Sequence, residues 1–318
     1  MDMIFSAAFL TSLVAGMVIS GVPLLLAGLG EQISEKAGVL NIGIEGMMLA
    51  GAYAGFLGAF QTGSLWVGFL YGTAAGMAVA SVMALLCVRL GLSQIVIGIG
   101  LTLGAEGLTA LLHHISFSQS YPRLPGVETL PIPGLAELPI VGPALFDRHP
   151  IVYLAVASAL VLSVLYRRTH LGLTLMAAGD KPAALDAAGV DVVRTRIAAV
   201  LCTGAFAGLG GAFMAEVGAG LFVPFMTGGA GFIAIVLAML ARGRPLRVLA
   251  GALMFGACLS MTTALQVAGV AVPTDVIQML PFAAVMAVLV IFGRNAILPA
   301  ALGSAYVRGD RGADGERS

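Results

Sequence analysis

The sequence predicts an all-α, polytopic membrane protein with about nine transmembrane helices, eight to ten being compatible with its apolar windows. Hydrophobic residues make up 59% of the 318-residue chain, charged residues only 10%, and the mean hydropathy is +1.02. A water-soluble domain of this length could not bury so much apolar surface, so lipid must be its solvent. The three cysteines all lie in apolar stretches and are odd in number, which argues against a disulfide framework.

Stretches of about 20 apolar residues, the length that crosses a bilayer core of roughly 30 Å, occur along most of the chain. They lie near residues 5–29, 39–60, 65–88, 92–112, 150–166, 197–217, 248–268 and 276–293. No basic residue precedes the first, so we expect a transmembrane helix there and not a cleaved signal peptide. Pro224 and a Gly-rich run interrupt a further apolar stretch. We therefore expect a broken or re-entrant segment near 218–241, shielded from lipid by protein.

The distribution of basic residues predicts the orientation. If the chain crosses nine times with an outer N-terminus, the inner segments hold fourteen of the sixteen Lys and Arg residues, and the outer ones hold only Arg123 and Arg148. Because basic residues accumulate on the cytoplasmic side, this favours an outer N-terminus and a cytoplasmic C-terminus.

One transmembrane domain is expected over residues 1–307, followed by a disordered cytoplasmic tail at 308–318. A long outer loop, 113–150, carries half of the fourteen prolines and should contain little regular structure. In the inner loop, 167–196, we expect Asp180 to cap a short helix, Pro182 to occupy its first turn and Gly189 to end it. So short a helix is marginal alone and needs a surface to lie against.

Two short segments suggest an internal repeat. "AGVLNI" (Ala37 to Ile42) is similar to "AGFIAI" (Ala230 to Ile235), and the predicted topology makes them enter the membrane from opposite sides. Such an inverted repeat is typical of transporters whose substrate binds between the two halves, near the bilayer midplane.

Motifs for soluble chemistry do not occur. The chain has no P-loop, no HExxH and no paired-Cys metal spacing, so neither an enzyme, a metal site nor a nucleic-acid partner is expected. Carboxylates inside apolar stretches remain, each costing roughly 3 kcal/mol at a helix centre unless it faces protein or water. They are Glu45, Glu106 and Glu216, with Asn41, Gln94 and Gln278 as neutral companions.

Asn41 and Glu45 are expected one turn apart on a single helical face. Two interpretations remain open for this pair. They hydrogen-bond to a neighbouring broken helix, or they contact a polar ligand.

"EKAGVLNIGIEGMMLAGAYAGF" (Glu35 to Phe56) resembles the permease subunits of bacterial ABC importers, in the superfamily that handles branched-chain amino acids, ribose-type sugars and nucleosides. The form "NIGIEG" (Asn41 to Gly46) is typical of the nucleoside branch. The run from Gly179 to Gly189 and the stretch "GGAGFIAIVLAMLARGRPL" agree with the family. Departures from the family pattern, at Met176, Asp180 and Arg244, lie on the predicted cytoplasmic face.

The resemblance implies inward transport of nucleosides by alternating access, in a bacterial inner membrane. It implies four kinds of partner: membrane lipid, a second and different permease subunit, two cytoplasmic ABC ATPase chains, and an extracytoplasmic substrate-binding lipoprotein. ATP and Mg²⁺ would lie on the ATPases, with no cofactor on this chain. A simple sugar or another small polar metabolite is the alternative substrate. A proton-coupled secondary transporter that uses the three glutamates, or a membrane scaffold, is the alternative class.

The short helix of the inner loop would then be the coupling helix, seated in a groove of the ATPase. The expected coupling residues are Gly179, Asp180, Lys181, Pro182, Ala183, Ala184, Asp186 and Gly189. The expected substrate path comprises Asn41, Glu45, Gln94, Glu106, Glu216, Phe222 and Phe225.

Overall fold

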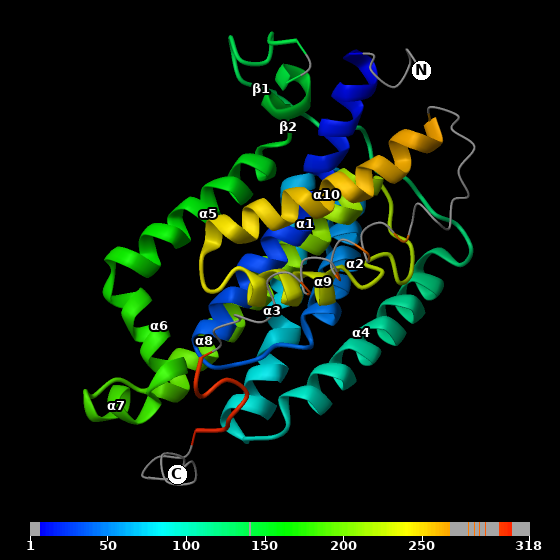
Figure 1. The fold of residues 1–318 in the computed structure, drawn as a ribbon. Coiled ribbons are helices and arrows are strands. Elements are labelled where there is room, and N and C mark those ends of the chain that lie inside the picture. The colour runs from blue at the N-terminus through cyan, green and yellow to red at the C-terminus, as the bar shows by residue number, and fades with distance from the viewer. Residues whose placement is uncertain are drawn as a thin grey trace.

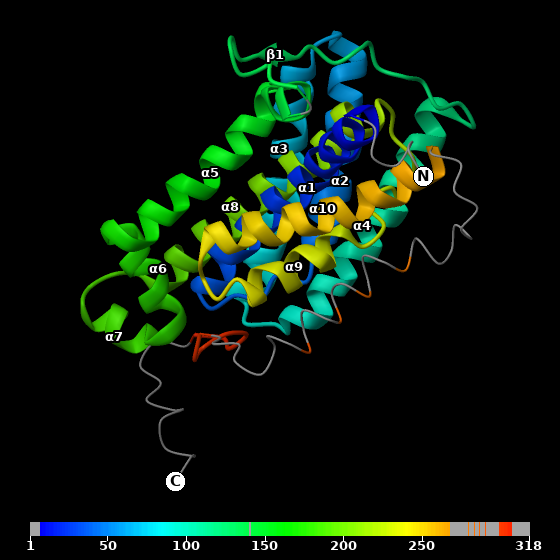
Figure 2. The same cartoon turned by 45° about the horizontal axis from the view of Figure 1, so that its top comes forward.

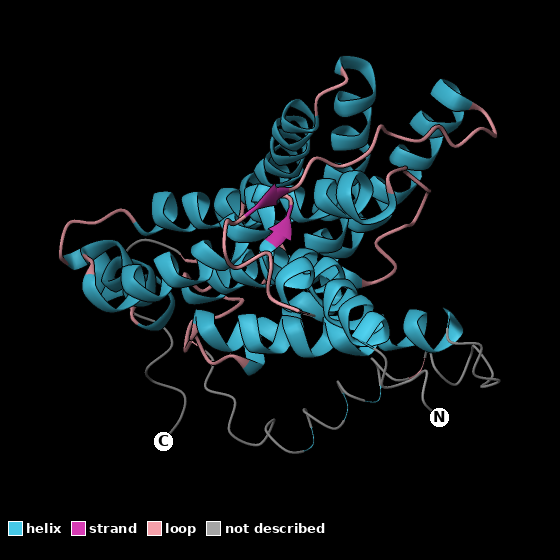
Figure 3. Ribbon diagram, turned by 90° about the horizontal axis from the view of Figure 1, so that it is seen from above, coloured by secondary structure: helices cyan, strands magenta, loops and turns pink. Residues whose placement is uncertain are grey.

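The computed structural model describes residues 7–139, 141–267 and 299–306, with four single positions at 279, 283, 286 and 290. Helices dominate these residues and confirm the predicted all-α, multi-pass membrane protein (Figure 1). The described part also holds a small β ladder that the sequence did not predict. Leu130–Pro131 (β1) pairs antiparallel with Asp147–Arg148 (β2), and both strands lie in the Pro-rich loop (Figure 3).

The helices follow in this order: α1 (Ala7–Lys36), α2 (Ile44–Thr62), α3 (Leu65–Met83) with the π-helix η1 (Ala84–Arg89), α4 (Gln94–Phe117), the π-helix η2 (Gly142–Phe146), α5 (Pro150–Arg168), α6 (His170–Asp180), α7 (Pro182–Ala187), α8 (Val192–Phe213) with the π-helix η3 (Met214–Ala219), α9 (Ala230–Leu240) and α10 (Pro245–Val267). Local signals set several boundaries. The side chains of Ser93, Thr169 and Asp191 accept hydrogen bonds from backbone N–H groups in the first turns of α4, α6 and α8.

Among the described residues, five helices are long and apolar enough to cross a membrane: 9–36, 65–89, 94–117, 150–168 and 192–219. Ala230–Leu240 and Pro245–Met261 are shorter apolar helices. The window at 276–293 lies outside the described residues apart from single positions, and so does the tail at 308–318. The multi-pass character is therefore established, while the count of nine crossings stays a prediction.

The long helices α1 and α8 form the centre of the bundle. α1 packs against α8, α9 and α10, and α8 packs against α1, α2 and α3. Figures 1 and 2 show α5, α6 and α7 on one flank of this centre and α4 on the other. Each half of the chain thus runs from a long helix through a broken segment to a buried helix and one more helix, as an inverted repeat requires.

The two similar hexapeptides do not occupy equivalent places in these halves. Ala37 to Ile42 forms the irregular segment before α2, whereas Ala230 to Ile235 forms the first turns of α9. The six-residue match is therefore out of register with the structural correspondence, and the repeat itself stays a prediction.

Glycines allow the closest helix contacts. A side chain at Gly51 of α2 would overlap the backbone of Gly208 in α8, and one at Gly76 of α3 would overlap the carbonyl of Gly204. Small residues at these crossings bring the backbones of α2, α3 and α8 together, which is how helices associate strongly in lipid.

The outer loop begins later than predicted. α4 continues to Phe117, so His113 lies in a helix and is buried against the rings of Phe117, Tyr121 and Phe222. The apolar window ended at 112 because the two histidines that follow are polar. The aromatic rings around His113 provide the contacts that continue the helix.

Candidate functional site

The first broken segment, residues 37–43, connects α1 to α2 inside the bundle. Gly38 takes a left-handed conformation (φ 86°) and turns the chain. The N–H of Leu40 donates to Oε1 of Gln94 at 2.8 Å, and the N–H of Asn41 donates to Oε1 of Glu31 at 3.0 Å. Side chains of α4 and α1 thus satisfy backbone groups that lipid could not.

Glu45, in the first turn of α2, binds the second broken segment. Its Oε1 accepts from the N–H of Gly229 at 2.8 Å and its Oε2 from the N–H of Gly231 at 2.6 Å. Gly229 is the N-cap of α9 and has φ 88°. A carboxylate at this place accepts from N–H groups that have no partner within α9, and its negative charge is stabilised by the positive end of the α9 dipole. This geometry supports the first interpretation of Glu45, a hydrogen bond to a neighbouring broken helix.

The expectation that Asn41 and Glu45 share a helical face is wrong. Asn41 lies in the irregular segment and α2 begins only at Ile44. The Asn41 side chain is buried, and its Nδ2 donates to Sδ of Met47 at 3.4 Å. Its Oδ1 has no hydrogen-bond partner among the described residues, so the amide still has a free acceptor.

The remaining path residues do not join this group. Glu216 is fully buried in η3 against Gly55 of α2 and Gly68 of α3, and neither carboxylate oxygen has a hydrogen-bond partner among the described residues. Gly55 lies ten residues beyond Glu45, about 15 Å along the helix. The two carboxylates therefore lie at separate levels of α2.

Phe222 and Phe225 have different environments although both lie in the second broken segment. The Phe222 ring is fully buried, with its centroid 5.2 Å from that of Tyr53. Phe225 is 57% exposed and has φ 63°, a conformation that is strained for a side chain of this size. Glu106 is half-buried on α4. Asn41 and Glu45 thus lie at the first broken segment, which Gln94 also contacts, whereas Glu216, Phe222 and Phe225 lie at or just before the second. Glu106 lies twelve residues along α4 from Gln94.

The inner loop forms two helices, α6 and α7, that project at one end of the molecule (Figures 1 and 2). Pro182 begins α7 and Gly189 follows its end with φ 83°, as predicted. The predicted cap at Asp180 is wrong, because Asp180 is the last residue of α6 and Lys181 precedes α7. The α6 helix was not predicted.

Most of α7 is free to contact a partner. Leu185 is its one buried residue, and packs with Ala178 and Val192. The other predicted coupling residues divide by exposure. Asp180, Lys181, Ala183, Ala184 and Gly189 are exposed, Pro182 and Asp186 are half-buried, and Gly179 is buried.

Gly179 connects this loop to the first broken segment. A side chain at Gly179 would overlap the carbonyl oxygen of Lys36. The N–H of Ala301 donates to the carbonyl of Gly179 at 2.9 Å, and the N–H of Gly303 donates to that of Gly38 at 3.1 Å. The end of α6 and the start of the break are therefore held in one assembly.

Sequence reasoning missed Arg196 and Glu31 as site residues. Arg196 of α8 is buried and donates to the carbonyl of Ala178 at 3.1 Å and to that of Ser304 at 2.7 Å. In the sequence, Arg196 is only one of the fourteen basic residues that are predicted to lie on the inner side. Glu31 is fully buried and lies within an apolar span, a signal that was present in the sequence.

Comparisons with known proteins identify the family to which this chain belongs. The family described as "Branched-chain amino acid transport system / permease component" matches residues 13–290. The putative glucose ABC transporter permease protein TsgC13 of Haloferax volcanii is 43% identical over 251 residues, 78% of this chain and 76% of the relative. Two further relatives match nearly end to end. The nucleoside ABC transporter permease protein NupC of Lactococcus lactis is 29% identical over 93% of this chain and 96% of its own length. The guanosine ABC transporter permease protein NupQ of Bacillus subtilis is 29% identical over 95% of this chain and 98% of its own length.

The family match covers most of the chain, including both broken segments and the projecting inner loop. Shared apolar helices alone would not produce a match of this extent. This protein is an ABC transporter permease, a member of the family of permease components of branched-chain amino acid transport systems.

Proposed function

We propose that the chain moves nucleosides into the cell by alternating access, as one transmembrane half of an ATP-driven importer. The observation that carries this substrate class is the nearly end-to-end match to relatives named for nucleosides and guanosine. The "NIGIEG" form of residues 41–46 supports it, because this form resembles that of the nucleoside branch of the superfamily.

The contacts of the described residues suggest how ATP hydrolysis moves the path. An ATPase that pushes on α7 displaces α6, whose Gly179 abuts Lys36 at the first broken segment. Glu45, at the far side of that segment, pulls on the N-terminus of α9. One displacement of the inner loop therefore reaches both broken segments through packed backbone and two hydrogen bonds.

An ABC permease works in a complex with ATPase and substrate-binding partners. We infer that this complex contains a second, different permease subunit, two ATPase chains that hold ATP and Mg²⁺, and an extracytoplasmic lipoprotein. The projecting α7 supplies the ATPase contact, and the Pro-rich loop at 118–149 borders the face for the lipoprotein. We place the complex in a bacterial inner membrane, with an outer N-terminus.

A simple sugar is the second candidate substrate, because the relative with 43% identity is named for glucose. A nucleoside carries an aromatic base, and a simple sugar does not. Phe225 in the second broken segment presents a ring that is 57% exposed, and rings of this kind stack on bases.

The test is ATP hydrolysis by the complex purified from its own host through a tag on this chain. With the binding protein present, adenosine, guanosine and uridine are compared with glucose and ribose. We expect stimulation by a nucleoside and none by glucose. Stimulation by glucose alone would replace the nucleoside by a sugar. Uptake that stops with a protonophore while ATP is held constant would contradict an ATP-driven importer.

A further inference from the structure

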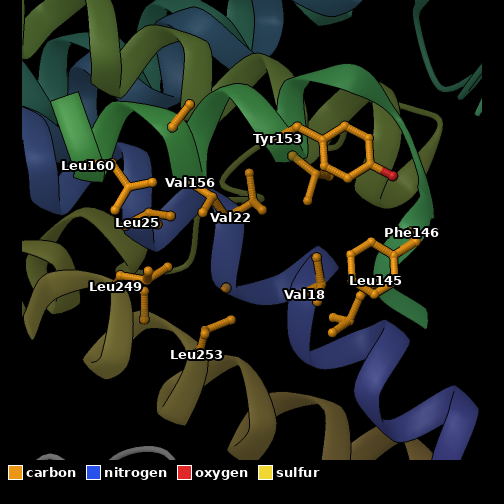
Figure 4. Close-up of a pocket in the computed structure, with 14 residues that line it drawn as sticks. Val18, Val22, Leu25, Leu145, Phe146, Tyr153, Val156, Leu160, Leu249 and Leu253 are labelled. Atoms are coloured by element: carbon orange, nitrogen blue, oxygen red, sulfur yellow. The ribbon is translucent and has the colours of Figure 1, made fainter. Parts of the chain in front are cut away.

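An apolar cleft of about 480 Å³ lies between α1, α5 and α10. Figure 4 shows Val22 and Leu25 of α1, Val156 and Leu160 of α5, and Leu249 and Leu253 of α10 around it. The Tyr153 hydroxyl at its edge is already engaged, since it accepts from the N–H of Arg148 at 3.2 Å and lies 3.3 Å from the carbonyl of Leu130. The cleft therefore offers hydrocarbon and almost no hydrogen bonds.

Such a cleft in a membrane protein fills with hydrocarbon. An apolar cavity of about 150 Å³ stays dry and holds one benzene molecule, so this volume accommodates a chain several times larger. Leu154 and Leu160 on α5 are more than half exposed, which places this flank of α5 against the acyl region of the bilayer.

A second, polar pocket of about 300 Å³ lies at the end of α1 that is predicted to face the cytoplasm. Its charged lining consists of Lys36, Arg242, Arg244 and Arg247 together with Glu35 and Asp180. Four cations against two carboxylates leave an excess of two positive charges. Arginines bind phosphate through paired N–H donors, and the pocket also lies at the N-terminus of α10, where the helix dipole favours an anion.

The two pockets are connected through the same helices. On α1, Lys36 follows Val18 by eighteen residues, five full helical turns, so these two residues lie on one face of α1. On α10, Arg247 of the basic pocket and Leu249 of the cleft are two residues apart and therefore lie at the same level of the helix on different sides. From Lys36 to Leu25, the nearest cleft residue on α1, the helix rises about 16 Å, close to the ~15 Å depth of one leaflet of hydrocarbon. An acyl chain that starts at the basic pocket therefore reaches the α1 side of the cleft with its distal part. Lys36 Nζ also lies 4.6 Å from the ring centroid of Tyr166, which brings α5 to the basic pocket.

We propose that α1, α5 and α10 form a binding site for one anionic phospholipid. The phosphate lies in the basic pocket with Lys36, Arg244 and Arg247, and the distal part of an acyl chain lies in the apolar cleft. The lipid would brace α10 and the end of α1 beside Gly179, where the coupling loop meets the bundle.

The proposed binding of the lipid headgroup is tested with the full complex, reconstituted in vesicles of equal parts phosphatidylcholine and phosphatidylglycerol. After extraction in mild detergent, native mass spectrometry measures the lipid that stays bound. We expect R244Q/R247Q to bind phosphatidylglycerol ~30-fold more weakly, at roughly 1 kcal/mol per basic residue, and R244K/R247K to retain most of the binding. The control R167Q/R168Q removes two inner charges outside the pocket and should bind as the wild type does.

The proposed binding of an acyl chain in the cleft is tested independently. Ala157→Trp fills the cleft and should displace lipid of either headgroup, whereas Leu154→Trp, on the same helix but outside the cleft, should not. Equal lipid retention in all variants would overturn the proposal. It would also fail if inorganic phosphate displaced phosphatidylglycerol fully, which would indicate a site for free phosphate, or if R244Q/R247Q lost the ATPase but kept the lipid. None of these outcomes depends on the nature of the transported substrate.

Discussion

The Glu45 carboxylate is held at both oxygens by backbone N–H groups at the start of α9, 184 residues away in one case and 186 in the other. Its place in an apolar segment follows from this contact. The start of α9 lies inside the bundle, and lipid cannot supply the acceptor that its N–H groups require. A leucine at position 45 would leave both donors unpaired.

Replacement of Glu45 by Gln measures this contact. The amide keeps one acceptor but turns an NH₂ group toward the other N–H, so we expect the complex to lose about 1.5–3 kcal/mol, the value of a charged hydrogen bond. The thermal midpoint of the complex in detergent should fall, and should not fall for Glu137→Gln in the exposed loop. Unchanged stability with reduced uptake would instead assign Glu45 to the transported molecule.

His149 gives a second measurement at this scale. Its buried ring lies 5.3 Å from that of Trp66, the one tryptophan of the chain, and its Nδ1 accepts from the N–H of Ile151. Burial lowers the pKa of His149 below 6.5, against the opposite influence of Glu128. The stability that depends on neutral His149 is therefore complete above pH 6.5 and is lost as the pH falls through the lowered pKa.

Because imidazolium quenches indole fluorescence, a titration of Trp66 emission reports this proton. The midpoint should lie below pH 6.5, and the transition should vanish in His149→Asn. A midpoint at 6.5 or above would show that the His149 side chain is solvated in the complex.

At the scale of elements, the contact between α6 and the first broken segment makes a prediction about coupling. Gly179→Val places a side chain against the carbonyl of Lys36 and forces the two apart. We expect uptake to fall about ten-fold or more, as an overpacking strain of 1–3 kcal/mol allows, while ATP hydrolysis continues. Gly126→Val is the matched control, because no atom of the described residues lies within 4 Å of its Cβ position.

Simultaneous loss of hydrolysis and uptake in Gly179→Val, with normal assembly, would place Gly179 in the ATPase contact itself. The residue would then act at the surface and not as a connection to the interior.

Local chemistry explains which elements could be predicted. Pro182 and Gly189 mark the limits of α7 in the sequence, whereas α6 contains Gly172 and Gly179 and depends on tertiary contacts of those glycines. The break at 37–43 is as apolar as α2, so a count of apolar residues extends the helix through it. The Gln94 and Glu45 contacts join residues that are distant along the chain, and no local pattern encodes them.

At the scale of the whole molecule, the long helices of the two halves pack on each other and on the helices that follow the partner's break. The predicted orientation can be measured on this frame. In a variant without its native cysteines, Arg123→Cys should react with an impermeant maleimide on intact cells, and Ala183→Cys on α7 only after permeabilisation. The reverse pattern would establish the mirror orientation.

The hydrogen bond between Ser34 of α1 and Thr203 of α8, 2.7 Å long, joins residues 169 positions apart. Synthesis proceeds at about 5–20 residues per second, so α1 waits roughly 10–30 s for this partner. Throughout that interval the Ser34 hydroxyl lacks this partner, and an unpaired hydroxyl in an apolar medium costs about 1–3 kcal/mol. The nascent first half must therefore remain beside the insertion machinery or a chaperone. A chain arrested before α8 should crosslink to that machinery through α1, and a chain arrested after residue 219 should be released from it.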